Sequence, residues 1–445
     1  MKINRRSVLS SALFGASYIG LRALVTGIPA SVLLKGRRAF ADGTVPTCGD
    51  KSKAQYVIFG TSGLGDPLNA NAPGTYNDPN IAHCLDQVLM PQKAMMIGGQ
   101  ATSAALPWTT LPQNVLDRMN VWHIMTNTPV HPKEPDVLAL VGTTTPNEML
   151  PSLLSKQLAP CLGTLQQQPI TLGASNPSEG LSFQGQPQPI IPPLALKATL
   201  TNPDGPLMNL TNLQSLRDQT LAQINDAFSG GATKAQKAYI DSLVISQQQV
   251  RGIRQDLLSA LSSIADNTVA SQITAAITLI QMNVTPVIAI HIPFGGDNHN
   301  DTALANEATQ TTTGFASIVS LMSSLAAVGL QDQVSFVTLN VFGRTIGPGN
   351  IDGRQHNPNH QVSLTIGKPF KGGIIGGVAP LTTGDYGAVS ISSSSGAGQA
   401  DGSGDIAPVD SLASFGKTVL SAVGVDDGFI ESAITFGKVV SGAIA

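Results

Sequence analysis

The apolar and polar positions of the chain form short β-rich runs that alternate with longer amphipathic stretches. The runs that predict strands are "YVIF" at residues 56–59, "NVWHIMTN" at 120–127, "VTPVIAIHI" at 284–292, "QVSFVTLNVFG" at 333–343 and "QVSLTIG" at 361–367. The run at 284–292 is apolar on both faces, which is typical of a central parallel strand.

Apolar residues at every third or fourth position predict amphipathic helices between and after these strands. The predicted helices lie at residues 213–228, 234–264, 269–281, 315–329 and 411–424, with a shorter helix after the last of them. Strands that alternate with helices predict a doubly wound α/β fold, with a mostly parallel sheet and helices on both faces.

We expect a single α/β domain over residues 42–445, because the sequence shows neither an internal repeat nor a clear linker. Residues 161–206 are rich in Gln, Pro and Gly and predict a long irregular excursion over the surface. The composition of "ISSSSGAGQADGSGD" at 391–405 predicts a flexible loop.

Residues 1–41 have the features of a twin-arginine export signal. Arg5 and Arg6 precede a weakly apolar run, and Ala39-Phe40-Ala41 matches the small-x-small pattern of a signal peptidase site. Arg22 interrupts the apolar run, which disfavours an uncleaved membrane anchor. We therefore expect a periplasmic or secreted protein that uses the twin-arginine translocon during export and keeps no stable membrane span after cleavage.

The composition excludes several classes of partner. Hydrophobic residues make up 42% of the chain and charged residues 12%, with a net charge of −3, so disorder and a basic nucleic-acid surface are both disfavoured. Three cysteines, Cys48, Cys84 and Cys161, follow the signal peptide without CxxC or Cys/His spacing, which predicts one disulfide or none.

Four residues with metal-binding side chains follow predicted strand ends. They are Asp66, Asp297, His299 and His356. Carboxylates and imidazoles hold Zn²⁺, Mn²⁺ and similar divalent ions, and a pair of such ions can clamp an ester during hydrolysis. A loop hydrogen bond explains any one of these histidines better than metal binding does, so the prediction depends on their shared placement. His356 and His360 have helical spacing, but Pro358 lies between them and excludes a helical zinc motif.

Three further residues are candidates for a catalytic role. Arg344 closes a predicted strand, where its guanidinium can pair with an anionic oxygen or act only as a structural ion-pair partner. Thr128 and His131 in "NTPVHPKEP" precede a possible helix whose amide groups can cradle an anion. Thr128 is then a candidate nucleophile, and an ordinary turn hydroxyl is the simpler alternative. The chain shows no P-loop, dinucleotide fingerprint or G-x-S-x-G around a suitable serine.

The paired arginines, "GLGDPLN", "GGDNHND", "NVFGRT", "GRQHNPNH" and "FKGGIIGG" occur in this order along the chain. This ordered set resembles the bacterial domain-of-unknown-function family 1501, which is grouped with the alkaline phosphatase and sulfatase superfamily. The resemblance covers nearly the whole chain after the signal peptide, and it implies an alkaline phosphatase-like fold with an acidic, histidine-rich site. It matches Asp66 to a first-strand aspartate and His356 to a late histidine. Asp297 and His299 match an Asp-x-His ligand pair.

The chain departs from the family pattern at two positions. Val341 and Gln355 stand where the family usually has acidic residues, so a two-ion site loses charge and keeps one ion or none. The first hypothesis is an exported, metal-dependent hydrolase of small anionic phosphate or sulfate esters. The alternative is a non-catalytic secreted or envelope protein that keeps the hydrolase fold. The low charge and the long excursion also permit a surface assembly component.

Overall fold

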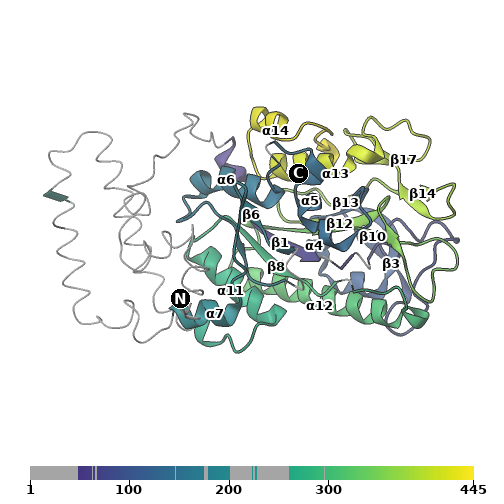
Figure 1. Ribbon diagram of the computed structural model, residues 1–445, viewed down its shortest axis with the longest axis horizontal. Helices are drawn as coiled ribbons and strands as arrows, with labels where there is room; N and C mark the ends of the chain where they lie inside the picture. The colour runs from purple at the N-terminus through teal and green to yellow at the C-terminus, as the bar shows by residue number, and fades with distance from the viewer. Residues whose placement is uncertain are drawn as a thin grey trace, which may run out of the picture.

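The computed structural model describes residues 49–445 except 63, 66–67, 146, 175–178, 201–222, 224–225, 228–259 and 295. The described chain has a mixed α/β fold around a seven-stranded sheet in the order β13-β4-β12-β9-β1-β8-β5 (Figure 1). In that order the strands are β13 (Gly373–Ile375), β4 (Met119–Ile124), β12 (Gln361–Ile366), β9 (Val334–Asn340), β1 (Tyr56–Ser62), β8 (Val287–His291) and β5 (Ile170–Thr171).

The sheet is mostly parallel, as the sequence predicts. β1 lies between β8 and β9 and pairs in parallel with both, and β5 and β13 pair in parallel with β8 and β4. β12 is the exception, because it runs antiparallel to both β4 and β9. The reversed strand therefore begins at the edge of the sheet where β1, β8, β9 and β4 end.

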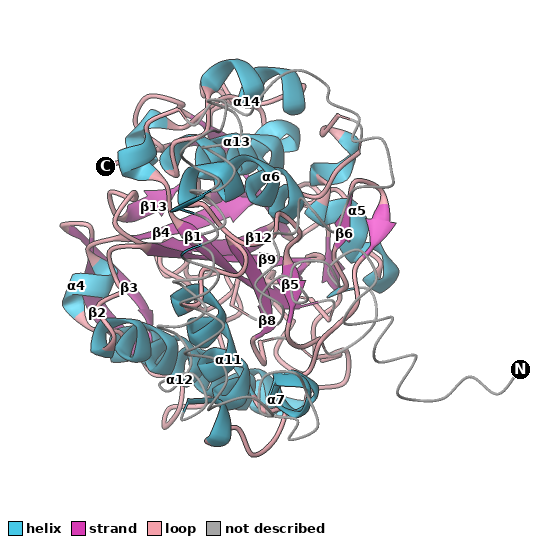
Figure 2. Ribbon diagram, turned by 90° about the vertical axis from the view of Figure 1, so that its left-hand side faces the viewer, coloured by secondary structure: helices cyan, strands magenta, loops and turns pink. Residues whose placement is uncertain are grey.

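Helices cover both faces of the sheet (Figure 2). One face carries α7 (Pro193–Leu200), α11 (Val269–Gln281) and α12 (Ala305–Ala327), and the other carries α6 (Leu150–Leu162), α13 (Ser411–Ala422) and α14 (Asp427–Ala433). Successive residues of β1 point to opposite faces. Ile58 accordingly belongs to the core that contains α11 and α12, while Val57 and Phe59 belong to the core that contains α6 and α13.

The remaining α-helices and strands that the structure describes in full are short. They are the helices α4 (Gln113–Leu116) and α5 (Glu134–Leu138) and the ribbons β2 (Gln92–Ile97) with β3 (Gln100–Ala105), β6 (Ser182–Phe183) with β7 (Gln186–Pro187), β10 (Gly343–Arg344) with β11 (His356–Asn357), β14 (Val378–Pro380) with β15 (Tyr386–Ala388), and β16 (Ser390–Ile391) with β17 (Gly398–Gln399).

Two helices match their predicted bounds closely, namely α11 and α13. The helix predicted at 315–329 begins earlier, at Ala305. The sequence pattern missed its first turns because they bury the polar residues Glu307 and Thr311 where the pattern requires apolar ones. Most residues of the helices predicted at 213–228 and 234–264 lie outside the described residues, as does the predicted signal peptide.

Two segments that were predicted to be irregular contain regular structure. The excursion at 161–206 supplies β5 to the main sheet and also forms α7. Most of the loop predicted at 391–405 is irregular, but Ile391 and Gly398–Gln399 within it pair as part of the hairpin of β16 and β17. The carboxylate of Asp405 holds the turn by accepting hydrogen bonds from the backbone and hydroxyl of Ser393, each at 2.7 Å.

Cys161 is disulfide-bonded, whereas Cys84 is a free and buried thiol. The chain therefore has a disulfide, which is one of the two outcomes expected from its cysteine count. In the part of the chain that the structure describes, no helix is both long and apolar enough to cross a bilayer.

Candidate metal centre

Loops from four strands meet at the edge of the sheet where β1, β4, β8 and β9 end. His131 lies in the loop that follows β4, and His299 lies in the loop that follows β8. His356 lies in the short strand β11, which precedes the antiparallel strand β12. His356 thus lies between the end of β9 and the start of β12, and because β12 runs antiparallel to β9 both of these ends are at the same edge.

His131, His299 and His356 form a cluster that can hold one metal ion. The atoms that each imidazole offers to a metal all lie within 4.8 Å of one another, and among the described residues no other histidines, cysteines or carboxylates are grouped in this way. The Nε2 atoms of His299 and His356 are 2.9 Å apart. The ring of His131 lies 4.7 Å from that of His356 and stands nearly perpendicular to it, at 88°.

The ring of His356 has a fixed orientation. Its Nδ1 donates a hydrogen bond to the backbone carbonyl of Pro129, so its Nε2 carries the lone pair when the ring is neutral. Burial lowers the pKa of His356, and the nearby charge of Arg344 lowers it further, against the opposing effect of the Pro129 hydrogen bond. The ring is therefore neutral at physiological pH and presents a lone pair to the cluster. Metal-binding imidazoles usually make a second hydrogen bond of this kind.

The ring of Phe342 packs against two of the three histidines, His356 and His131. Its ring is fully buried and stacks on His356 with 4.1 Å between centroids. The ring of His131 meets it at 65° with 4.9 Å between centroids. This contact restricts how far either imidazole can rotate, so the phenyl ring preorganises the cluster.

Arg344 connects loops around the cluster. Its Nη2 donates to the carbonyl oxygens of Leu64 and Gly296, at 2.5 and 2.7 Å, and its guanidinium carbon lies 5.2 Å from the centre of the Phe342 ring. Its backbone pairs with that of His356 between β10 and β11. The side chain is almost entirely buried, and a contact with an anionic substrate stays a prediction.

Gly353 explains why the two histidine loops approach so closely. Its φ is +128°, and a Cβ atom at this position would lie 2.0 Å from the backbone oxygen of His299. The next residue, Arg354, donates its backbone N–H to the carbonyl of Asn298 at 3.0 Å. Only glycine allows this direct backbone contact between the loops that contain His299 and His356.

Asp297 and Thr128 are two further predicted site residues that the structure describes. Asp297 is 65% exposed, and its Oδ1 lies 3.4 Å from the Nε2 of His299, so it lies at the rim. Thr128 is buried and directly precedes Pro129 in the chain. Asp66 lies outside the described residues. The preceding residue, Gly65, packs against Phe342 and Arg344, where a Cβ atom would come within 3 Å of each.

His131 was expected to be a catalytic group, and the structure places it with the metal ligand candidates instead. It follows a strand end, as the other candidates do, so the rule that selected them could also have selected it. His360 has a different role, because it is buried and its Nε2 lies 2.9 Å from the Nδ1 of His123. No helix joins His356 to His360, which confirms that the helical zinc motif is absent.

A buried acidic group near the same edge was missed by the sequence analysis. Glu179 accepts hydrogen bonds from the Nδ1 of His291 and the hydroxyl of Thr61, both at 3.0 Å, at the ends of β8 and β1. Burial raises the pKa of Glu134 well above its usual value, and the charge of Glu179 adds to this effect. The sequence around Glu134, "PVHPKEP", has no apolar pattern that would show Glu134 to be buried.

Val341 and Gln355 add no ligand to the cluster. Val341 is fully buried in the core that contains Phe342. Gln355 is exposed. Its backbone carbonyl accepts the N–H of Thr345, and its own N–H donates to the hydroxyl of Thr345. The described residues therefore provide one histidine cluster and no acidic pair for a second ion at these positions.

No protein-family model matches the sequence, and no curated protein is significantly similar to it.

Proposed function

We propose that the protein is an exported, metal-dependent hydrolase of small phosphate or sulfate esters, with one divalent ion held by His131, His299 and His356. The convergence of the three imidazoles, all within 4.8 Å of one another, is the observation that supports this proposal most strongly. Of the common divalent ions, Zn²⁺ fits best, because three histidines around an open fourth position are a frequent catalytic zinc arrangement.

His131, His299 and His356 would hold the zinc ion, which would supply an activated water at neutral pH because zinc lowers the pKa of bound water to about 7. The protein groups hold and orient the reactants. His356 is fixed by Pro129 and Phe342, and the exposed carboxylate of Asp297 beside His299 can accept a proton from water. The positive charge of Arg344 next to the cluster favours an anionic ester over a neutral one.

The proposal includes an alkaline phosphatase-like fold and export by the twin-arginine translocon. The seven-stranded, mostly parallel sheet with helices on both faces is compatible with such a fold. The paired arginines at the amino terminus and the disulfide at Cys161 support an oxidising compartment such as the periplasm. The net charge of −3 is unfavourable for a nucleic-acid partner.

The second candidate is a non-catalytic binding or structural protein of the cell envelope. Val341 and Gln355 favour it, because one is in the hydrophobic core and the other points to solvent, so neither helps to hold a second ion. A single metal then serves to bind a ligand or to stabilise the loops.

Metal analysis combined with an assay separates these candidates. The chain without residues 1–41 is purified, loaded with Zn²⁺ and assayed on aryl phosphates and aryl sulfates, with His356→Ala as the comparison. Turnover that requires both zinc and His356 supports the hydrolase. One tightly bound zinc without turnover supports the non-catalytic protein, and absence of bound metal contradicts both forms of the proposal.

A further inference from the structure

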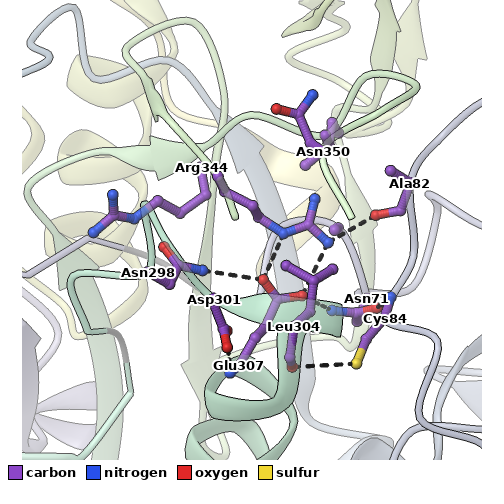
Figure 3. A network of polar contacts seen from close by, with 12 residues as sticks. Asn71, Ala82, Cys84, Asn298, Asp301, Leu304, Glu307, Arg344 and Asn350 are labelled. Atoms are coloured by element: carbon purple, nitrogen blue, oxygen red, sulfur yellow. Dashed lines mark hydrogen bonds and ion pairs between the residues drawn. The ribbon is translucent and has the colours of Figure 1, made fainter. Parts of the chain in front are cut away.

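Glu307 is a fully buried carboxylate that several polar groups surround (Figure 3). The guanidinium of Arg354 donates to both of its oxygens, through Nε to Oε2 and through Nη2 to Oε1. Asn71 donates to Oε1 at 2.6 Å, and Asn298 donates to Oε2 at 3.3 Å. Both oxygens of the buried carboxylate thus accept hydrogen bonds from protein groups.

Two of these partners belong to the loops of the metal centre. Asn298 directly precedes His299, and Arg354 lies two residues before His356. Arg354 also donates to the carbonyls of Thr345 and Ala82, at 2.9 and 2.7 Å. The single carboxylate of Glu307 therefore connects the loop after β8 to the segment before β12, and the direct Arg354–Asn298 backbone bond runs beside this connection.

The position of Glu307 itself is fixed by Asp301, which also lies in the His299 loop. The carboxylate of Asp301 accepts the backbone N–H groups of Asn306 and Glu307, each at 2.9 Å, in the first turn of α12. The loop that contains His299 is therefore held to α12 on both sides of the histidine, by Asn298 before it and by Asp301 after it (Figure 3).

A buried ion pair of this kind is poor evidence for net stability, because removing both charges from water offsets most of their attraction. Such a pair can instead specify one arrangement of the groups that it joins. We propose that Glu307 is a positioning residue of the metal centre, which sets the approach of His299 to His356 without touching the ion. This inference rests on the metal centre proposed above.

The test measures two properties of full-length mature protein and of its variants Glu307→Gln and Asn298→Ala. The first property is zinc affinity, determined by competition with a chromophoric chelator. The second is the rate at which diethyl pyrocarbonate modifies His299 and His356 in metal-free protein, determined by peptide mass spectrometry. The second measurement needs no metal, so it remains decisive if the protein proves not to bind zinc and the proposed function fails.

Glu431→Gln is the control for a loss of stability alone. It removes the carboxylate that pairs at 2.5 Å with Lys417, which is buried, and Glu431 lies in α14, on the other face of the sheet from α12. A merely structural role for Glu307 would give Glu307→Gln and Glu431→Gln the same behaviour at the histidines.

We expect Glu307→Gln to weaken zinc binding by about 10- to 100-fold, as for other groups that orient metal ligands, and to speed modification of both histidines. Glu431→Gln should leave both properties unchanged. Asn298→Ala should shift both in the same direction by a smaller factor, and it decides the question if Glu307→Gln does not fold. Wild-type reactivity of both histidines in whichever of these two variants folds would overturn the proposal, as would equal changes in Glu431→Gln.

Discussion

The Nε2 atoms of His299 and His356 lie 2.9 Å apart, although 57 positions separate the two residues in the sequence. Because the Nδ1 proton of His356 is directed at Pro129, the lone pair on its Nε2 faces His299. The two nitrogens are close enough to bind one metal ion together with His131, since the atoms that the three rings offer all lie within 4.8 Å of one another.

Replacing His356 with alanine should remove a ligand and weaken zinc binding by about 100-fold or more, since even outer groups that orient a ligand contribute about 10- to 100-fold. Calorimetric titration with Zn²⁺ measures the effect. His291→Gln is the matched control, because this histidine pairs with Glu179 and lies outside the cluster. Equal affinities of His356→Ala and the wild type would contradict the assignment.

Gly353→Ala should separate the two histidine loops, because the added Cβ would lie 2.0 Å from the backbone oxygen of His299. Gly349→Ala is a control from the same loop, since Gly349 also has a positive φ, of +95°, but a Cβ there meets nothing within 4 Å. We expect Gly349→Ala to cost about 1–2 kcal/mol of stability with normal zinc affinity. Gly353→Ala should cost more and lose zinc affinity, as chemical unfolding and metal titration can show.

Phe342→Ala should affect both stability and the metal centre. Removing this buried ring should lower the free energy of unfolding by about 3–5 kcal/mol, and it leaves the stacked face of His356 unsupported. Phe415→Ala removes an equally buried ring that packs on Trp122 at 5.4 Å, and it should cost similar stability without changing zinc affinity. The prediction fails if zinc affinity falls equally in both variants.

Acid should destabilise the fold through His123 and His360. Burial lowers the pKa of His123 to about 4 and that of His360 well below its usual value, so both rings are neutral in the folded protein. The unfolded chain binds protons near pH 6.5, so the stability that these groups contribute is complete above that pH and is lost as the pH falls toward 4. Each ring contributes a slope of up to about 1.4 kcal/mol per pH unit.

Urea unfolding between pH 5 and pH 7 measures this slope directly. His360→Gln should reduce the pH dependence by the contribution of one ring, because His123 remains buried in that variant. An unchanged slope would mean that the buried pair is not the source of the acid sensitivity.

The sequence predicted the strands around the site well, because buried strands have clear apolar runs. It also predicted that His299 and His356 lie at one edge of the sheet, since that follows from where the strands end. The direction of β12 was not predictable, because an apolar run such as "QVSLTIG" reads the same in a parallel or an antiparallel strand. The two-residue strand β5 is too short to show a period.

The part played by His131 depends on local backbone geometry that composition does not show. Asn127 adopts a positive φ of 60°, and a short 3-10 turn at His131–Lys133 then directs the chain toward Phe342. The network of Glu307 was equally hidden, because a carboxylate in the first turn of an amphipathic helix is normally solvent-exposed. Its burial depends on Arg354, which lies 47 positions away in the sequence.

The most direct test of the central claim is zinc titration of the mature protein, followed by X-ray absorption spectroscopy of the loaded site. We expect one zinc ion per chain, with three imidazole nitrogens at about 2.0–2.1 Å and a light-atom fourth ligand. Simultaneous replacement of His131, His299 and His356 by alanine should abolish this signal. A protein that takes up no zinc, or a triple variant that binds it as well as the wild type, would contradict the account.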